Sequence, residues 1–278
     1  MRTRLLSLSV RWVAFLIALG CHAQSRVPIA PTLDQLTPEQ GQAFLSGFRQ
    51  ARLNGDLCLR FEIVHKPRLG DSLAPVQGTL WASSHGDAQL LRGEIKDAQG
   101  KPSFAFITMK SGKESRVWIS RRGAFAQELD GKAAFMPLAD GLLISPFDLQ
   151  LPFTHWPATA YLSTEKRRRP VHVFDALNQP GLEPAKVNYA IDHVYGVLIQ
   201  SSCFDASGKK TRVLSVEEFS KVDEQWMLAA CSVRDEVTRD ADLLRITEAA
   251  LGDRLPPETF EPASLTRAAA QPAHFKKL

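Results

Sequence analysis

The chain has 278 residues, in which 34 Lys and Arg stand against 30 Asp and Glu for a formal net charge of +4. This small excess gives no support to nucleic acid or an anionic membrane surface as the main partner. No Cys-x-x-Cys or His-x-x-x-His spacing occurs, so we expect no metal site. The absence of a glycine-rich phosphate loop likewise leaves no cofactor to expect.

Residues 1–23 have the composition of a secretory signal peptide. Three arginines precede a short apolar run, Trp12 to Leu19, which is too short to span a membrane. Two processing routes stay open. A peptidase could cut after Ala23, or residues 18–21 could serve as a bacterial lipobox, with alanine where leucine is usual, and make Cys21 a lipidated N-terminus. We therefore expect an exported protein, either periplasmic or anchored to the outer membrane through Cys21.

Cleavage after Ala23 leaves 255 residues (278 less 23), with 31 basic against 30 acidic side chains. That length is enough for one large β domain. We expect a linker at residues 24–36, the domain at residues 37–263 and a C-terminal tail at residues 264–278.

A helix is predicted from residue 37 to residue 53. Thr37 can cap it, the proline that follows suits the first helical position, and Gln40 completes a capping box. Apolar side chains, Phe44 and Phe48 among them, then recur with a 3.6-residue period. The Asn-Gly pair that follows residue 53 ends the helix.

Beyond the helix, short segments rich in β-branched and aromatic residues alternate with turn clusters. This pattern predicts an antiparallel β meander. Four longer strands are expected between residues 194 and 248. The shorter segments are Leu57 to Lys66, Gly78 to Ser83, Ser103 to Met109 and Arg116 to Ser120.

The turns between residues 194 and 248 allow the strand register to be predicted. Directly opposed residues share a face of the sheet, so one face collects apolar side chains, and Arg212 and Asp235 form a cross-strand ion pair. The expected pairs are Ile199 with Val216, Cys203 with Arg212, Val216 with Cys231, Leu214 with Val233, Arg212 with Asp235, Val233 with Ile246 and Asp235 with Leu244. The apolar face comprises Val197, Ile199, Leu214, Val216, Met227, Ala229, Cys231, Val233, Leu244 and Ile246.

The exported chain keeps three cysteines, Cys58, Cys203 and Cys231, so it has at most one internal disulfide. The predicted register separates Cys203 from Cys231 by two strand spacings, about 9.6 Å. Bridged Cα atoms lie within about 7 Å of each other, so we predict that these two are not joined. Cys58 could pair with either of them, and the sequence leaves that open.

Three segments carry a family resemblance. Residues 192–219, DHVYGVLIQSSCFDASGKKTRVLSVEEF, hold a hairpin around an Asp-x-x-Gly-Lys turn. Residues 222–247, VDEQWMLAACSVRDEVTRDADLLRIT, have a Trp after a turn and an Asp-x-x-Thr near the strand end. Residues 255–265, LPPETFEPASL, contain Pro-x-x-Phe-x-Pro. This order resembles the outer-membrane lipoprotein-sorting protein family, the superfamily of periplasmic lipoprotein carriers and their receptors. The match is strongest over residues 140–263 and weak over residues 55–135.

The resemblance implies a mainly β fold with a short N-terminal helix. It would be an incomplete antiparallel β-barrel, or half-barrel, around an apolar cavity, with the helix as a lid or plug. The resemblance also implies non-catalytic binding of acyl chains of lipids or lipoproteins in the bacterial envelope. The carriers' cavity arginine is not assigned to any residue of this sequence.

The stretch LLISPFDLQLPFTHWP, residues 142–157, holds the residue types of a nucleophile triad in Ser145, Asp148 and His155. No Gly-x-Ser-x-Gly elbow surrounds Ser145, and Pro146 removes a backbone N–H that often serves an oxyanion. We therefore expect no enzyme here, only turn or rim hydrogen bonds.

The same stretch alternates large apolar residues with other residues, which predicts a strand with one apolar face. We expect that row to face the cavity or its lid, with Trp156 at the rim. A solid core would use the same side chains, and this alternative stays open. The expected ligand wall comprises Phe44, Phe48, Phe104, Phe106, Trp118, Phe147, Leu149, Leu151, Phe153, Trp156, Ile199, Val216 and Met227.

The basic run at residues 166–169 could attract anionic headgroups or the acidic flank of a lipoprotein, or form a solvated hairpin tip. Two functions therefore follow from the sequence. One is a carrier or sorting protein that binds acyl chains. The other is an envelope sensor or scaffold that uses the same fold to bind a partner protein.

Overall fold

The computed structural model describes residues 34–51, 55–97, 99–111, 114–129, 135–223, 225–252 and 254–278. The expected signal peptide, Cys21 and most of the expected linker lie outside these ranges. Among the described helices, none combines the length and the apolar composition that a membrane crossing needs.

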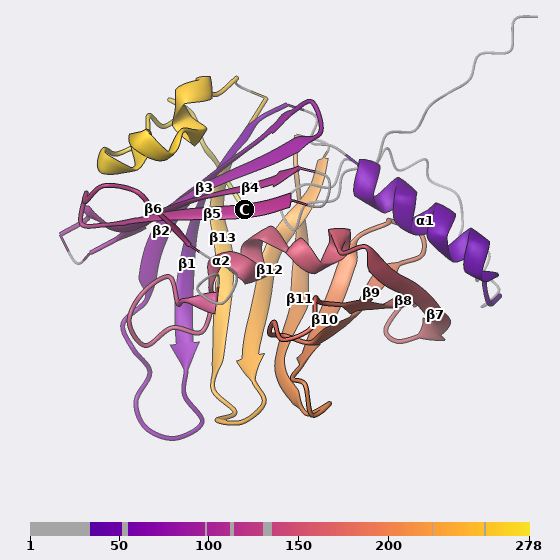
Figure 1. The fold of residues 1–278 in the computed structure, drawn as a ribbon. Coiled ribbons are helices and arrows are strands. Elements are labelled where there is room, and N and C mark those ends of the chain that lie inside the picture. Colours follow the sequence, from indigo (N-terminus) through magenta and orange to yellow (C-terminus); the bar gives the residue numbers. More distant parts are fainter. Residues whose placement is uncertain are drawn as a thin grey trace, which may run out of the picture.

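A single antiparallel sheet of 14 strands forms the body of the protein (Figure 1). Its order is β6-β5-β4-β3-β2-β1-β13-β12-β11-β10-β9-β8-β7, and β14 pairs with β13 beside this path. The sheet bends strongly without closing into a barrel, which confirms the predicted half-barrel. The strands are β1 (Leu57–Lys66), β2 (Val76–His85), β3 (Ala88–Lys96), β4 (Pro102–Ser111), β5 (Glu114–Arg121), β6 (Gln127–Leu129), β7 (Ala158–Lys166), β8 (Pro170–Leu177), β9 (Lys186–Asp192), β10 (Leu198–Phe204), β11 (Lys210–Val222), β12 (Gln225–Asp235), β13 (Ala241–Leu251) and β14 (Lys276–Lys277).

The N-terminal helix α1 (Pro38–Gln50) begins with the predicted capping box. Thr37 Oγ1 accepts the N–H of Gln40 at 3.3 Å, and Gln40 Oε1 accepts the N–H of Thr37 at 2.9 Å. The helix ends three residues before the predicted residue 53, because Ala51 is extended and its N–H returns to the Phe48 carbonyl. Helix α1 packs against β7 at one end of the sheet (Figure 1).

The strand predicted from the alternation at residues 147–153 is wrong. Residues Pro146–Gln150 form the short helix α2, and Pro152–His155 form the 3-10 helix η2. Both prolines stand at first helical positions, where the missing N–H costs nothing. Between the two helices Leu151 takes a left-handed φ of 53°, which ends α2. The apolar row therefore belongs to a helical segment that lies across the sheet (Figure 1).

Two of the three predicted hairpin registers are confirmed. Cys203 lies opposite Arg212 across β10 and β11, and Arg212 lies opposite Asp235 across β11 and β12. Across β12 and β13 the prediction is wrong by four residues, since Val233 lies opposite Asp242.

The turn between β12 and β13 closes early because Asp235 Oδ1 accepts the N–H groups of Val237 and Thr238. A shift by an even number of residues keeps every side chain on its own face. The predicted separation of apolar and polar faces across these strands therefore survives the error in register.

Residues 254–275 cover the outer face of the sheet, opposite α2 (Figure 1). They include the 3-10 helices η3 (Pro257–Phe260) and η4 (Pro262–Thr266). Arg92 of β3 is buried there, pairs with Glu94 at 2.6 Å and donates to the carbonyls of Thr259 and Arg267. The domain boundary expected at residue 263 stays a prediction, and the chain on both sides of it packs on the sheet.

All three described cysteines are free and buried. The prediction that Cys203 and Cys231 are not joined is confirmed, and Cys58 is unpaired as well. Burial raises the pKa of each of the three thiols to about 12. They therefore serve as apolar packing groups near neutral pH.

Candidate apolar binding site

The inner face of the sheet is covered by residues 135–156, which include α2 and η2 and are called the plug below. One continuous apolar cluster joins the plug, the inner face and α1. The main sheet residues of this cluster are Leu59, Phe61, Ile63, Leu80, Phe104, Phe106, Phe174, Tyr189, Ile191, Leu214, Met227, Leu228, Val233, Leu244 and Ile246. The inner face is thus an apolar wall that is covered mainly by one short segment, the plug.

A row of aromatic rings runs from the plug toward α1. The ring centroids of Phe147 and Phe153 are 5.8 Å apart, and those of Phe153 and Tyr189 are 5.3 Å apart. Tyr189 stacks on Phe174 at 5.5 Å, and Phe174 stacks on Phe44 of α1 at 6.4 Å. Burial raises the pKa of the Tyr189 phenol, so the hydroxyl stays neutral among these rings.

Most residues of the expected ligand wall meet in this cluster. Two lie elsewhere. Trp118 packs with Ala105, Ile107 and Leu265 on the outer face, and Ile199 packs near Val171, Val173 and Ala190 in a separate cluster. The residues that meet in the inner cluster are Phe44, Phe48, Phe104, Phe106, Phe147, Leu149, Leu151, Phe153, Trp156, Val216 and Met227.

Strand pairing explains both departures. Trp118 lies opposite Ile107, whereas Ile119 lies opposite Phe106 and takes the inner position. In β10 the pairing with β9 shifts between Leu198 and Gln200, so a bulge gives the inner position to Leu198 and turns Ile199 outward.

An ion pair between Asp148 of α2 and Arg212 of β11 fastens the plug to the sheet. Arg212 Nε donates to Asp148 Oδ1 at 2.9 Å, and its terminal nitrogen donates to Oδ2 and to the Leu143 carbonyl. The two side chains are 15% and 4% exposed. Burial opposes the charge of Arg212, but Asp148 outweighs it and the pKa of the guanidinium is raised. The expected Arg212–Asp235 ion pair is wrong, because Arg212 turns inward to the plug.

Asp242 of β13 holds the chain just before α2. Its Oδ2 accepts the N–H groups of Leu143 and Ile144 at 2.6 and 2.9 Å. Its Oδ1 lies 2.7 Å from His65 Nδ1 on β1. Asp242 is fully buried, so its carboxylate depends on these protein partners for hydrogen bonds.

The far end of the plug is held by β4, β5 and α1. Gln150 Oε1 accepts from Ser115 Oγ at 2.6 Å, and Gln150 Nε2 donates to the Met109 carbonyl at 3.0 Å. From α1, Arg49 donates to the carbonyls of Thr154 and Trp156 at 2.6 and 3.0 Å. Polar contacts therefore fix the plug at several points around its apolar side.

Of the three residues with triad side chains, Ser145 and Asp148 are hydrogen-bonded to each other, whereas His155 contacts Thr154. Ser145 Oγ donates directly to Asp148 Oδ2 at 2.6 Å and is fully buried. His155 Nδ1 lies 2.9 Å from Thr154 Oγ1. Asp148 thus receives the serine and Arg212 together, an arrangement that stabilises the start of α2.

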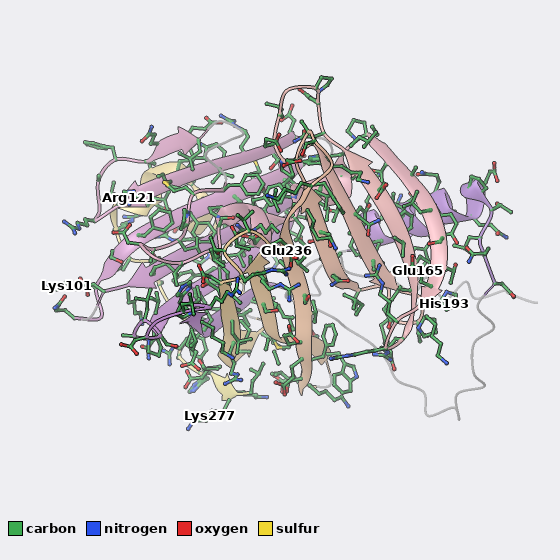
Figure 2. The ribbon with its side chains drawn as sticks, turned by 90° about the horizontal axis from the view of Figure 1, so that it is seen from below. Lys101, Arg121, Glu165, His193, Glu236 and Lys277 are labelled. Atoms are coloured by element: carbon green, nitrogen blue, oxygen red, sulfur yellow. The ribbon has the colours of Figure 1, made fainter. Side chains whose placement is uncertain are left out.

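The basic run forms the tip of the β7–β8 hairpin. Arg167 pairs with Glu165 at 3.3 Å and also donates to Gln200, and Arg169 lies 3.2 Å from Asp192. Figure 2 labels Glu165 and His193 at this end of the molecule. Neighbouring acids and amides thus hold two of the four basic side chains.

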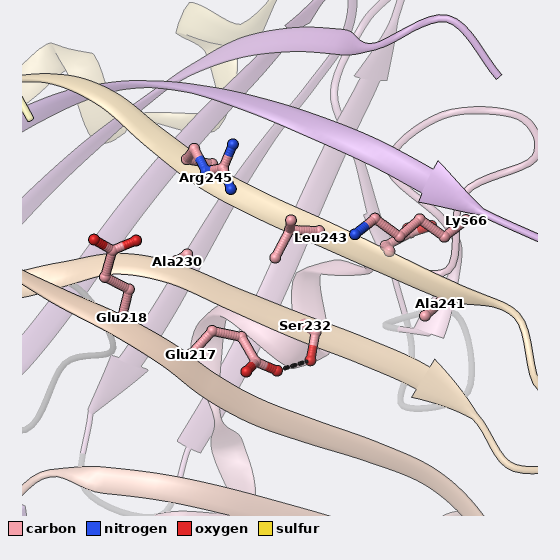
Figure 3. A pocket seen from close by; sticks show the side chains of 9 residues that line it. Lys66, Glu217, Glu218, Ala230, Ser232, Ala241, Leu243 and Arg245 are labelled. Carbon is pink, nitrogen blue, oxygen red and sulfur yellow. Dashed lines mark hydrogen bonds between the residues drawn. The ribbon is translucent and has the colours of Figure 1, made fainter. Parts of the chain in front are cut away.

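Two hollows open on the outer face of the described sheet. One of about 500 Å³ lies over β11, β12, β13 and β1 and is lined by Lys66, Glu217, Glu218 and Arg245 among others (Figure 3). The second, of about 260 Å³, lies between β4 and η4. The plug covers the inner wall, so the apolar side chains of the wall pack against those of the plug.

Comparison with family models finds no match, and no curated protein matches either. Solved structures share the fold. A domain from Vibrio parahaemolyticus described as an outer membrane lipoprotein-sorting protein domain superposes with a TM-score of 0.70 at 15% identity, covering 82% of this chain and 99% of its own. A DUF1329 family protein from Desulfovibrio piger gives a TM-score of 0.68 at 12% identity, covering 82% of this chain and 98% of its own.

A LolA superfamily protein from Nitrosomonas europaea gives a TM-score of 0.60 at 13% identity, covering 81% of this chain and 98% of its own. The chain therefore has the LolA-like fold, which confirms the resemblance at the level of fold.

Proposed function

We propose that the protein binds acyl chains of lipids or lipoproteins in the bacterial cell envelope, on the inner face of the half-barrel and without catalysis. One observation carries the proposal: the apolar inner wall is covered by the plug and not by a second sheet. The plug can move without the loss of any strand pairing, because none of its residues belongs to a strand. The fold shared with a lipoprotein-sorting domain supports the same reading.

The magnitudes of apolar burial suit an exchange between plug and ligand. Burying one methylene stabilises by about 0.8 kcal/mol, so a dozen methylenes contribute roughly 10 kcal/mol before ordering costs. Phe147, Leu149, Leu151 and Phe153 of the plug are buried, and at about 1.5–3 kcal/mol each they contribute about 6–12 kcal/mol. An acyl chain can therefore offset the loss of these four contacts, which suits a protein that must also release its ligand.

Native mass spectrometry and lipid extraction of protein purified from the envelope test the proposal. We expect bound acyl chains at a stoichiometry near one. A fluorescent fatty acid should bind more tightly to an Asp148→Asn variant, in which Arg212 loses its counter-charge and the plug is less firmly held. The matched control is Glu128→Gln, which breaks the exposed Arg116–Glu128 pair and should leave binding as in the unaltered protein. Lipid-free protein together with no binding by either variant would sink the proposal.

The alternative function, an envelope sensor or scaffold that binds a partner protein, predicts a different result for protein purified from the envelope. A stoichiometric protein partner with no lipid in the envelope pull-down would favour it. Metabolic labelling with a fatty-acid probe would then tell a tethered form, lipidated at Cys21, from a soluble periplasmic form.

A further inference from the structure

The sheet divides into a fork between β12 and β13. Their ladder runs from the Arg234–Ala241 pair to the Ala230–Arg245 pair and stops there. Beyond that point β13 continues to Leu251 and stays paired with β1 along its other edge. The first residues of β12 pair with β11 on their far side. The closed end of the fork therefore lies at the Ala230–Arg245 pair.

Residues 276–278 occupy this fork. Lys277 lies opposite Glu248 and Lys276 lies opposite Ala249, in antiparallel pairing with β13. The N–H of Leu278 donates to the Thr247 carbonyl at 3.1 Å. Since β1 fills the other edge of β13 at the same level, this segment lies on the edge that faces β12, and it runs toward the closed end.

The side chains of the segment alternate in what they contact. Lys276 forms an ion pair with Asp223 in the turn between β11 and β12. Lys277 is exposed at the surface of the molecule (Figure 2). Leu278 packs against the apolar cluster of the inner face. The fork thus accepts an extended strand with a basic residue, any residue and an apolar residue in that order.

The segment is held weakly for a strand in a sheet. Only two of its residue pairs belong to a ladder, whereas strands of five or six residues are usual. The ion pair between Lys276 and Asp223 is exposed, 62% and 45%, and exposed pairs contribute little. Elements with few buried contacts and an exposed backbone open locally at low cost.

We propose that the fork between β12 and β13 is a binding site for an extended peptide segment of a partner protein, and that residues 276–278 occupy it until displaced. Recognition is by strand addition, in which main-chain hydrogen bonds to β13 supply affinity and alternate side chains supply specificity. The partner segment places Lys or Arg at Asp223 and a large apolar side chain where Leu278 packs. This site lies at a strand edge, so it does not depend on acyl chains binding beneath the plug.

A labelled peptide with the sequence of residues 272–278, PAHFKKL, tests the site by fluorescence anisotropy. The full chain carrying Lys276→Glu and Leu278→Asp has a segment that repels Asp223 and cannot pack its last side chain. We expect the peptide to bind this variant at least fivefold more tightly than it binds the unaltered chain. Lys277→Glu is the matched control, because Lys277 is exposed, and it should leave peptide binding at the unaltered level.

A charge exchange then fixes the location. Asp223→Lys, added to the weakened chain, should weaken binding of PAHFKKL about fivefold and favour binding of the same peptide with Lys276→Glu to a similar degree. Equal binding by the weakened and the Lys277→Glu chains, or no binding to a weakened chain with an unchanged unfolding temperature, overturns the proposal. If the double substitution prevents folding, Lys276→Glu alone replaces it with the same expected order and the same overturning result.

Discussion

Asp148 of the plug and Arg212 of β11 form a two-point ion pair in which both side chains are largely buried. The carboxylate also accepts the N–H and Oγ–H of Ser145 through Oδ2. Both carboxylate oxygens are thus hydrogen-bonded to protein donors, and such bonds help a buried charge to be tolerated. Residues far apart in sequence set the conformation of the plug through this contact.

Asp148→Asn should destabilise the fold by about 3–5 kcal/mol, because it leaves the Arg212 guanidinium buried without a counter-charge. The free energy of unfolding in urea measures the effect. A loss below about 1 kcal/mol would contradict the importance given to this pair.

The paired change Asp148→Asn with Arg212→Met should recover most of the loss, since both buried charges are then gone. Breaking the exposed Arg116–Glu128 pair should cost less than about 1 kcal/mol in the same assay.

Gly41→Ala should loosen α1 from the sheet. A Cβ at Gly41 would lie 2.5 Å from Cβ and Cγ of Tyr161 on β7, and such crowding costs about 1–3 kcal/mol. At Gly47, on the exposed side of the same helix, a Cβ meets nothing within 4 Å. Gly47→Ala should therefore stabilise by up to about 1 kcal/mol through helix propensity. Limited proteolysis within residues 38–50 and thermal unfolding compare the two, and equal effects would rule out the close approach.

Phe153→Ala should cost about 3–5 kcal/mol, because the ring is 1% exposed and packs between Phe147 and Tyr189. The cavity left behind is lined by aromatic groups and should increase uptake of a fluorescent fatty acid. Leu162 on β7 is 52% exposed, and Leu162→Ala should change the free energy of unfolding by less than about 0.5 kcal/mol. A fall in fatty-acid uptake by the folded Phe153→Ala protein would argue against ligand binding beneath the plug.

His172 should make stability depend on pH. Burial first, and the nearby His193 second, lower the pKa of His172 from its usual 6.5 to about 4. Above pH 6.5 the ring is neutral in both the folded and the unfolded chain. Between pH 6.5 and 4 the unfolded chain binds a proton that the folded chain does not bind, so stability falls as the pH decreases and levels off below about 4.

Urea midpoints at pH 7.5, 5 and 4 measure this loss. His172→Gln should reduce the loss, whereas His85→Gln, which changes an exposed residue at the end of β2, should leave it unchanged. An identical pH profile for the unaltered and His172→Gln chains would show that other groups are responsible.

The parts of the fold that local chemistry determines could be predicted from the sequence. Thr37 and Gln40 make a capping box with no help from the rest of the chain, and the Asp205 turn sets the β10–β11 register through its own hydrogen bonds. The register predicted across β12 and β13 was wrong, because Asp235 accepts hydrogen bonds from two N–H groups that a symmetric turn leaves free. Ile199 was misplaced because a bulge changes which residue faces inward, and no composition signal marks it.

The plug was beyond prediction for a different reason. Its alternating apolar residues fit a strand, yet Asp148 is fixed by Arg212, which follows 64 residues later in the chain. The roles of Asp242 and His65 could not be predicted from the sequence, because no local motif surrounds them. Their hydrogen bonds form only when β1, β13 and the plug meet in the fold. The prolines at 146 and 152 were local signals for helical turns, since both suit a first helical position, and Ser145 with Asp148 has the spacing of a capping box.

Arg49 connects helix α1 to the plug on the inner face of the sheet. It donates from α1 to two carbonyls of the plug, so a plug that leaves its place takes those acceptors away from the helix. By thermodynamic reciprocity, a molecule whose affinity for α1 changes when the plug moves must change the stability of the plug in its place by the same factor. Under the proposed function, a second macromolecule that binds this helix in that way would detect whether the interior holds a ligand, and would also bias its loading, without entering it.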